Sequence, residues 1–401
     1  MRTFIIILCI LAVAVLAVAV YLVVTTPKEA APLRFPLTAA QQELLGHVPP
    51  DAEAYALVPA PAVLMAKLEA NPIARDPVLQ WTEEHPLPPA AMLGRADAVA
   101  WRSDKVTAYA VRFDPVRALI ARAWTMFSTV DATWHGRVLI IGAGAERRAG
   151  FSPPAELQLA NGLPEGDVFV VQRKASRGAY PPMGRPAVSS VKITAEHIDI
   201  ASRAAANETD RLKPVLRFEL PRGAMLAVSF SEPPRLLGDL ERLIASDLEA
   251  LAGQGGVIAL YGVDTGTLLP RPFGALVVPA NEASRAAAAK YGQVVGEVRE
   301  SGEQLVIPFD RNSATQYLND ATAPLPWPAN RWALRMDPVR LIPVLRKAGD
   351  NPALRFAAPR IHRGARDLRR WMGTLEKARS VEAAASAGNG VEELRVRVAS
   401  K

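Results

Sequence analysis

Few residues of this sequence are spaced as a catalytic site would require. Ser189 and Lys192 form a Ser-x-x-Lys pattern, in which lysine assists a serine nucleophile when one helical turn places both on one face. Residues 188–193 alternate as in a β-strand, however, and residues three apart in a strand point to opposite sides. The sequence has no Gly-x-Ser-x-Gly motif, and Cys9 is its only cysteine. We therefore predict no catalytic residue.

Metal and nucleotide patterns are also incomplete. The five histidines show no His-x-x-x-His spacing, and the densest group of metal-ligand types is Glu83-Glu84-His85 at a predicted helix end. Gly142-Ala-Gly144 follows a predicted strand as a dinucleotide-binding loop would. Arg147 then occupies the position where that fingerprint needs a third small residue. We therefore predict no metal and no cofactor.

A basic amphipathic helix is predicted over residues 360–379. Its apolar residues recur at helical spacing, and its basic residues gather on the other side: Arg360, Arg363, Arg366, Arg370 and Lys377. Two interpretations stay open. The basic side is an anion-binding face for lipid head groups or an anionic polymer, or it is the solvated outside of an ordinary core helix. The net charge of +7 suits anionic neighbours, but aromatic residues do not interleave with the basic ones, so nucleic acid is not expected.

The tetrapeptide Asp-Pro-Val-Arg occurs twice, at residues 114–117 and 337–340, each time between an alternating run and a helical run. Asp114 and Asp337 are placed to cap the helices by accepting hydrogen bonds from free N–H groups of the first turn. The proline that follows suits the first helical position. Strand, cap and helix are followed by hairpin patterns, such as the Gly388-Asn389-Gly390 turn between two strand runs. The sequence predicts an α+β fold of repeated β-α-β-β units, forming antiparallel sheets with helices on one face.

The run from Phe4 to Val24 carries no charge, glycine or proline, and as a helix it would cross a hydrocarbon core of about 30 Å. We predict an uncleaved transmembrane signal-anchor in the inner (cytoplasmic) membrane, single-pass, with the body in the periplasm or outside. The alternative is a signal peptide cleaved after Ala17-Val18-Ala19. The predicted organisation is as follows: anchor 1–24, linker 25–45, first repeat half 46–205, linker 206–218 and second repeat half 219–401.

The segment Val48-Pro-Pro-Asp-Ala52 before a strand, the strand–proline–helix units and the anchor together resemble a group of uncharacterised bacterial membrane-anchored envelope proteins. Those proteins are built from tandem repeats of a domain of unknown function. The resemblance covers residues 46–401 as a pattern, and it implies no catalytic residue.

The leading functional hypothesis is a membrane-anchored extracytoplasmic protein that acts as a non-enzymatic binding or structural module of the cell envelope. Its expected partners are the lipid bilayer through Phe4 to Val24, and an envelope protein or anionic polymer. One alternative is an envelope enzyme whose site is assembled from distant loops, near Tyr180 or the Glu83–His85 segment. Another is a periplasmic carrier of an apolar ligand, which requires a large apolar cavity between sheet and helices.

Overall fold

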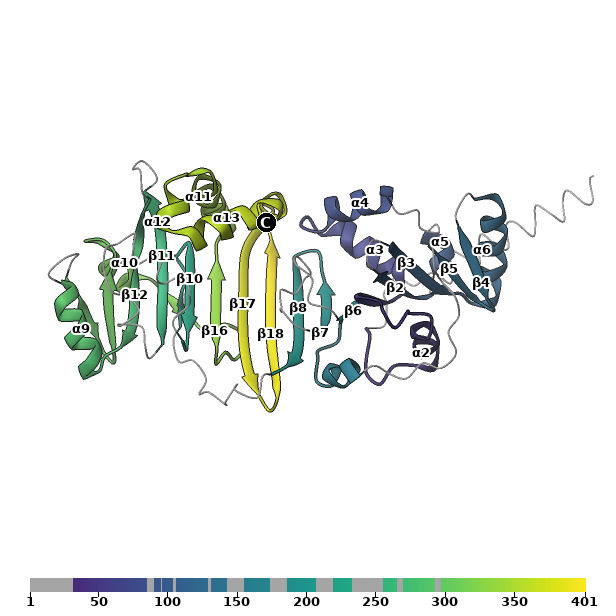
Figure 1. Cartoon of the computed structure of the whole chain (residues 1–401), viewed down its shortest axis with the longest axis horizontal. Helices are drawn as coiled ribbons and strands as arrows, with labels where there is room; N and C mark the ends of the chain where they lie inside the picture. The colour runs from purple at the N-terminus through teal and green to yellow at the C-terminus, as the bar shows by residue number, and fades with distance from the viewer. Residues whose placement is uncertain are drawn as a thin grey trace, which may run out of the picture. The chain divides into compact units, whose positions relative to one another are not determined.

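The computed structural model describes most of the chain, namely residues 32–84, 90–94, 96–103, 106–128, 131–142, 155–173, 186–206, 219–232, 255–264, 270–292 and 297–401. The chain divides into two compact units (Figure 1). Unit 1 comprises Met1–Ala195 and Ile200–Ala205, and unit 2 comprises Glu196–Asp199 and Ala206–Lys401. Both units are mixed α+β structures dominated by antiparallel strands with helices, which confirms the α+β part of the prediction.

The described elements of unit 1 are α2 (Ala39–Leu45), β1 (Ala54–Pro59), α3 (Pro61–Ala70), α4 (Arg75–Glu84), α5 (Ala90–Leu93), β2 (Asp97–Ser103), β3 (Val106–Arg112), α6 (Pro115–Phe127), β4 (Ala132–His135), β5 (Val138–Ile141), the 3-10 helix Ala155–Ala160, β6 (Val168–Gln172), β7 (Ala187–Ile193) and the end of β8 (His197–Ala205). The strands lie in the order β8-β7-β6-β1-β2-β3-β5-β4. Neighbours from β7 to β4 pair antiparallel.

Both faces of the unit 1 sheet are covered. Leu44 and Leu45 of α2 belong to the core cluster that includes Ala108 and Ala110 of β3. The alternate β3 residues Tyr109 and Val111 belong to a second cluster, which includes residues of α5 and α6. The prediction of helices on one face is therefore wrong. The physical reason is visible in β5, where Val138–Ile141 are all buried, as in a strand with apolar cover on both sides.

Part of the segment predicted as a linker, 25–45, belongs to this core. Leu33, Leu37, Leu44 and Leu45 are buried, and Thr38 forms a capping box with Gln41 at the start of α2. The second predicted linker, 206–218, lies outside the described residues except for its first residue.

Helix α6 presents large apolar side chains to solvent. It buries Ala118, Ala121 and Arg117 against the sheet. Its exposed side carries Leu119, Met126 and Phe127, which are 69%, 81% and 91% exposed.

The described elements of unit 2 are β9 (Leu220–Pro221), β10 (Leu226–Phe230), β11 (Gly256–Asp264), β12 (Arg271–Pro279), α9 (Glu282–Gly292), β13 (Arg299–Ser301), β14 (Gln304–Pro308), α10 (Ser313–Asn319), β15 (Thr322–Ala323), β16 (Trp332–Met336), α11 (Pro338–Asp350), α12 (Leu354–Ala357), α13 (Pro359–Leu375), β17 (Ala378–Gly388) and β18 (Val391–Ser400). The sheet order is β13-β14-β12-β11-β10-β16-β17-β18, while β9 and β15 pair separately.

The unit 2 sheet also has apolar cover on both faces. Ala259 of β11 belongs to a cluster that includes Ala314 and Tyr317 of α10. The neighbouring residue Ile258 belongs to a different cluster, which includes Ala288 of α9. In Figure 1, α11, α12 and α13 lie together beside the ends of strands β10 to β17.

The predicted membrane location is corrected by the structure. The predicted span, Phe4–Val24, lies outside the described residues. In the part of the chain that the structure describes, no helix is both long enough and apolar enough to cross a membrane. The longest helix there is α13, with 17 residues, five of which are arginines. The prediction of a single-pass protein of the inner membrane with an exported body is therefore contradicted, and we withdraw it.

Candidate functional site

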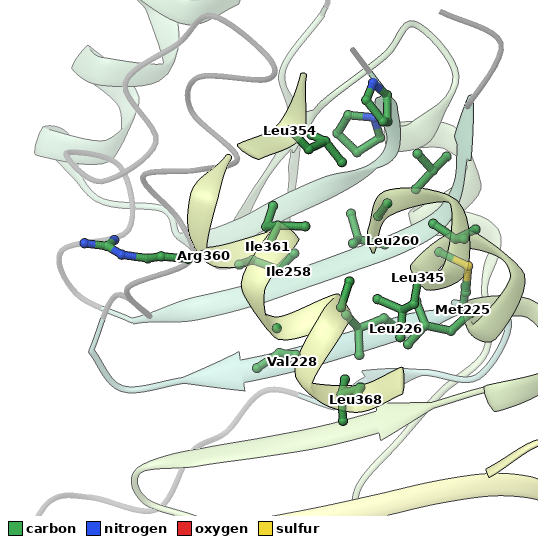
Figure 2. Close-up of a pocket in the computed structure, with 18 residues that line it drawn as sticks. Met225, Leu226, Val228, Ile258, Leu260, Leu345, Leu354, Arg360, Ile361 and Leu368 are labelled. Atoms are coloured by element: carbon green, nitrogen blue, oxygen red, sulfur yellow. The ribbon is translucent and has the colours of Figure 1, made fainter. Parts of the chain in front are cut away.

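A cavity of about 300 Å³ lies in unit 2 between the sheet and the helices α11, α12 and α13 (Figure 2). Its described lining consists of apolar residues and glycine with one exception, Arg360. The sheet side contributes Met225, Leu226, Val228, Ile258, Leu260, Val263, Pro270 and Pro272. The helical side contributes Leu341, Val344, Leu345, Ala348, Leu354, Arg360, Ile361, Gly364, Ala365 and Leu368.

The floor of the cavity is set by the register of two strands. Leu226 of β10 pairs directly with Leu260 of β11, and Val228 pairs with Ile258. Directly opposite residues of an antiparallel pair point to the same face, so these four side chains form one apolar surface. The intervening residue Ala227 belongs to the cluster on the other face. Figure 2 shows Val228 and Ile258 on the strands that lie beneath α13.

One wall of the cavity is formed by the apolar face of helix α11. Leu341, Val344, Leu345 and Ala348 recur at i, i+3, i+4 and i+7 along α11, so they share one face. Helix α11 starts where Asp337 accepts hydrogen bonds from the backbone N–H groups of Val339 and Arg340, at 3.0 and 3.3 Å. The predicted cap at Asp337 is thus confirmed, and it fixes the angular position of the apolar face.

Small residues let α11 and α13 approach each other beside the cavity. A Cβ added to Gly349 of α11 would lie 3.7 Å from atoms of Ala365. Gly364, one residue earlier on α13, lines the cavity, and a Cβ there would meet nothing within 4 Å. The space beside Gly364 is therefore open, whereas the space beside Gly349 is filled by the neighbouring helix.

The predicted basic residues are spread along α13 and past its end. Arg360 borders the cavity, and its side chain runs outward from α13 (Figure 2). Arg363 and Arg366 are exposed on α13, and Arg366 lies beside Gly349 of α11. Lys377 follows the end of α13 and is half-buried. The side chain of Arg370 lies outside the described residues.

Two further arginines near this helix form ion pairs. Arg369 forms an ion pair with Asp350, and Arg346 forms one with Glu376 at 2.6 Å. The titratable groups with shifted pKa values in the described residues lie elsewhere. Burial raises the pKa of Tyr109 in unit 1 to about 12, and burial together with the nearby Asp320 carboxylate raises that of Tyr317 to about 12. The described lining of the cavity is thus apolar apart from one cation, Arg360, and no described carboxylate or histidine lines it.

The weaker sequence candidates do not assemble into sites. Ser189 is buried on β7 and shares a hydrogen bond of 2.8 Å with Ser202, while Lys192 is exposed, so the Ser-x-x-Lys pattern forms no serine–lysine pair. His85, Tyr180 and Gly144 lie outside the described residues. In the described part of the chain, no group of three or more His, Cys, Asp or Glu side chains could hold a metal ion.

One feature of unit 1 and one feature of unit 2 were not predicted from the sequence. The rings of His47 and His135 lie side by side, with centroids 5.6 Å apart, although 88 positions separate them in the sequence. The carrier alternative required an apolar cavity between sheet and helices, but its position and lining were not predicted, because the lining comes from three separate stretches of chain. The signal that could have indicated it is the apolar face of residues 341–348, which continues beyond the cap at Asp337.

No family model matches the chain, and no match was found among curated proteins or solved structures. Nothing in these comparisons or in the described residues indicates enzymatic activity.

Proposed function

We propose that this chain is a non-enzymatic binding module and that unit 2 holds an apolar ligand in the cavity between the sheet and α11–α13. The observation that supports this function is the chemistry of the lining, which is apolar in every described residue except Arg360. A volume of about 300 Å³ falls at the lower end of the range for ligand pockets, roughly 300–1,000 Å³.

The size of the cavity limits the ligand. An engineered cavity of about 150 Å³ with a Leu, Ile and Phe lining stays dry and binds benzene. The present cavity has about twice that volume, so it has room for on the order of a dozen carbon atoms. Each buried methylene group would contribute about 0.8 kcal/mol before the cost of association is subtracted. A single medium-length alkyl chain therefore suits the cavity better than a bulky ring system.

Titration calorimetry with decan-1-ol tests this function on the full chain. We expect saturable binding with a stoichiometry of one. Gly364→Leu should abolish it, because the new side chain would enter the cavity. The same substitution should raise the stability of α13 by up to about 1 kcal/mol, since leucine favours a helix over glycine.

Gly373→Leu is the matched control. Gly373 is also in α13, is exposed, and has open space beside it, but it does not line the cavity. It should therefore gain helix stability and keep decan-1-ol binding. The proposed function is wrong if the unsubstituted protein shows no binding tighter than about 1 mM, or if Gly364→Leu binds as well as Gly373→Leu.

We also propose that the two units are built from repeated β-α-β-β units, as in the tandem-repeat proteins that the sequence resembles. Support comes from the two Asp-Pro-Val-Arg joints. Both lie between a strand and a 13-residue helix, and in both the aspartate accepts hydrogen bonds from the second and third residues of that helix. Full repetition would require corresponding strands to follow α6 and α11 in the same order, which an experimental structure of the whole chain would test.

A further inference from the structure

The border of the cavity differs chemically from its interior. Arg360 and Leu368 both line the cavity and are both exposed to solvent, so the cavity reaches the surface along α13 between them. An exposed arginine next to an apolar cavity keeps its aliphatic stem against the apolar lining and its guanidinium in water. In Figure 2 the Arg360 side chain leaves the cavity in this way, whereas the leucine and isoleucine side chains cluster within it.

Further charged residues follow on the same flank of α13. At about 100° per residue, positions 363 and 367 lie within roughly 60° of position 360 around the helix. Arg363 and Asp367 are both exposed. Among the described residues on this flank of α13, two arginines and one carboxylate therefore stand beside the cavity border, an excess of one positive charge. A neutral ligand would make no use of these cations.

We infer that the ligand is a single-chain amphiphile with an anionic head group, such as a carboxylate or a phosphate monoester. Its alkyl chain occupies the cavity, and its head group lies at the surface beside Arg360 and Arg363. This inference rests on the proposed function, because the chain must first enter the cavity. The arginine guanidinium binds both kinds of head group through paired N–H donors. The carboxylate of Asp367 repels the same head group, because both are negatively charged.

Calorimetry with decanoate, decyl phosphate and decan-1-ol separates the head group from the chain. We expect Arg360→Gln and Arg363→Gln each to weaken decanoate or decyl phosphate binding up to about fivefold, as for exposed ion pairs. Arg363 does not line the cavity, so Arg363→Gln should leave decan-1-ol binding unchanged. Asp367→Asn should strengthen binding of the anionic ligands by a similar factor. The affinity for these ligands should also fall as salt is raised, with little change for decan-1-ol.

Arg366→Gln is the matched control, because Arg366 is an exposed arginine of the same helix that lies on the side of α11. It should leave all three affinities unchanged. Whichever anionic ligand shows the dependence on Arg360 and Arg363 identifies the head-group chemistry. If decan-1-ol binds but neither anionic ligand responds to these substitutions, the head-group inference is overturned and the proposed function stands. If none of the three ligands binds the unsubstituted protein, the proposed function itself fails.

Discussion

Arg340 joins helix α11 to the sheet that it covers, because its Nη1 donates a hydrogen bond of 2.6 Å to the carbonyl oxygen of Gly223. Its Nη2 also donates to the carbonyl oxygen of Tyr261, on β11. The backbone of the same residue is capped by Asp337. One side chain thus ties the start of the cavity wall to β11 and to the bend that precedes β10.

Replacing Arg340 with methionine should loosen this wall. The carbonyl groups of Gly223 and Tyr261 would lose their side-chain donors, at a cost of about 1–3 kcal/mol. Hydrogen exchange measured by mass spectrometry should show faster exchange in α11. Arg311→Met, at an exposed turn position, is the control and should leave exchange in α11 unchanged. Equal exchange in the two variants would contradict this role of Arg340.

The two Asp-Pro-Val-Arg joints should respond differently to loss of their aspartate. Asp337→Ala removes a helix cap, which costs about 1 kcal/mol. Asp114→Ala removes the same kind of cap and also the carboxylate that pairs at 2.7 Å with Arg117, whose side chain is only 2% exposed. Loss of a carboxylate partner of a buried charge costs up to about 3–5 kcal/mol, so the Asp114 variant should be the less stable by roughly 2 kcal/mol.

Urea denaturation with hydrogen exchange on each helix would measure both effects in the full chain. The prediction fails if α6 loses no more protection in Asp114→Ala than α11 loses in Asp337→Ala. Asp114→Asn provides a further comparison, because asparagine can cap a helix but carries no charge for Arg117.

Ile258→Ala should enlarge the cavity and change the preferred chain length. Ile258 is buried on β11 and lines the cavity, so truncation should cost about 2–5 kcal/mol of stability. In a series from octan-1-ol to tetradecan-1-ol, the preferred alcohol should become longer by about three carbons, the number removed. Ile307→Ala is the matched control, since Ile307 is equally buried in the same core cluster but does not line the cavity. It should lose stability without a change in preference, and an identical shift in both variants would refute the assignment.

Asp97 gives a prediction for pH dependence. Burial raises the pKa of this carboxyl group, although a hydrogen bond with Gln41 and the charge of Arg112 oppose the rise. A carboxyl group whose pKa is higher in the folded than in the unfolded state stabilises the fold when protonated. That stability is fully present below the unfolded pKa and is lost as pH rises through the folded pKa.

At pH 7 the folded protein therefore carries the cost of an ionised, partly buried carboxylate at position 97. Asp97→Asn should be more stable than the unsubstituted protein at pH 7 in urea denaturation. The difference should shrink as the pH falls through the raised pKa towards the unfolded value, because Asp97 then becomes neutral as well. A difference that grows on acidification would show that the hydrogen bond and Arg112 outweigh burial.

The local elements could be predicted from the sequence because their signals lie within a few residues. The caps at Asp114 and Asp337 are confirmed, and so is the final hairpin, where Asn389 and Gly390 adopt φ values of +53° and +74°. The strand 188–193 is confirmed as β7, with Ser189 buried and Lys192 exposed. The caps, the hairpin and the strand each depend on residues that are close together in the sequence.

Features that depend on distant segments could not be predicted. The cavity needs Leu226, Ile258 and Leu345 on one side of one sheet, and the sequence does not give the strand order β11-β10-β16 that places them there. The contact between the rings of His47 and His135 could not be predicted for the same reason. The segment after α2 and the end of β4 meet only in the folded unit. Four consecutive apolar residues, Val138–Ile141, are a local signal of cover on both sheet faces. They do not show which helix provides that cover.

Helix α6 has a consequence for handling the protein. Its water-facing side carries Leu119, Met126 and Phe127, while its core side carries alanines and an arginine. Surface of this kind lowers solubility and promotes retention on hydrophobic chromatography media. Precipitation by sulfate salts should therefore begin at a lower concentration than for the Phe127→Gln variant, because salting-out acts on the apolar surface that a protein leaves in water.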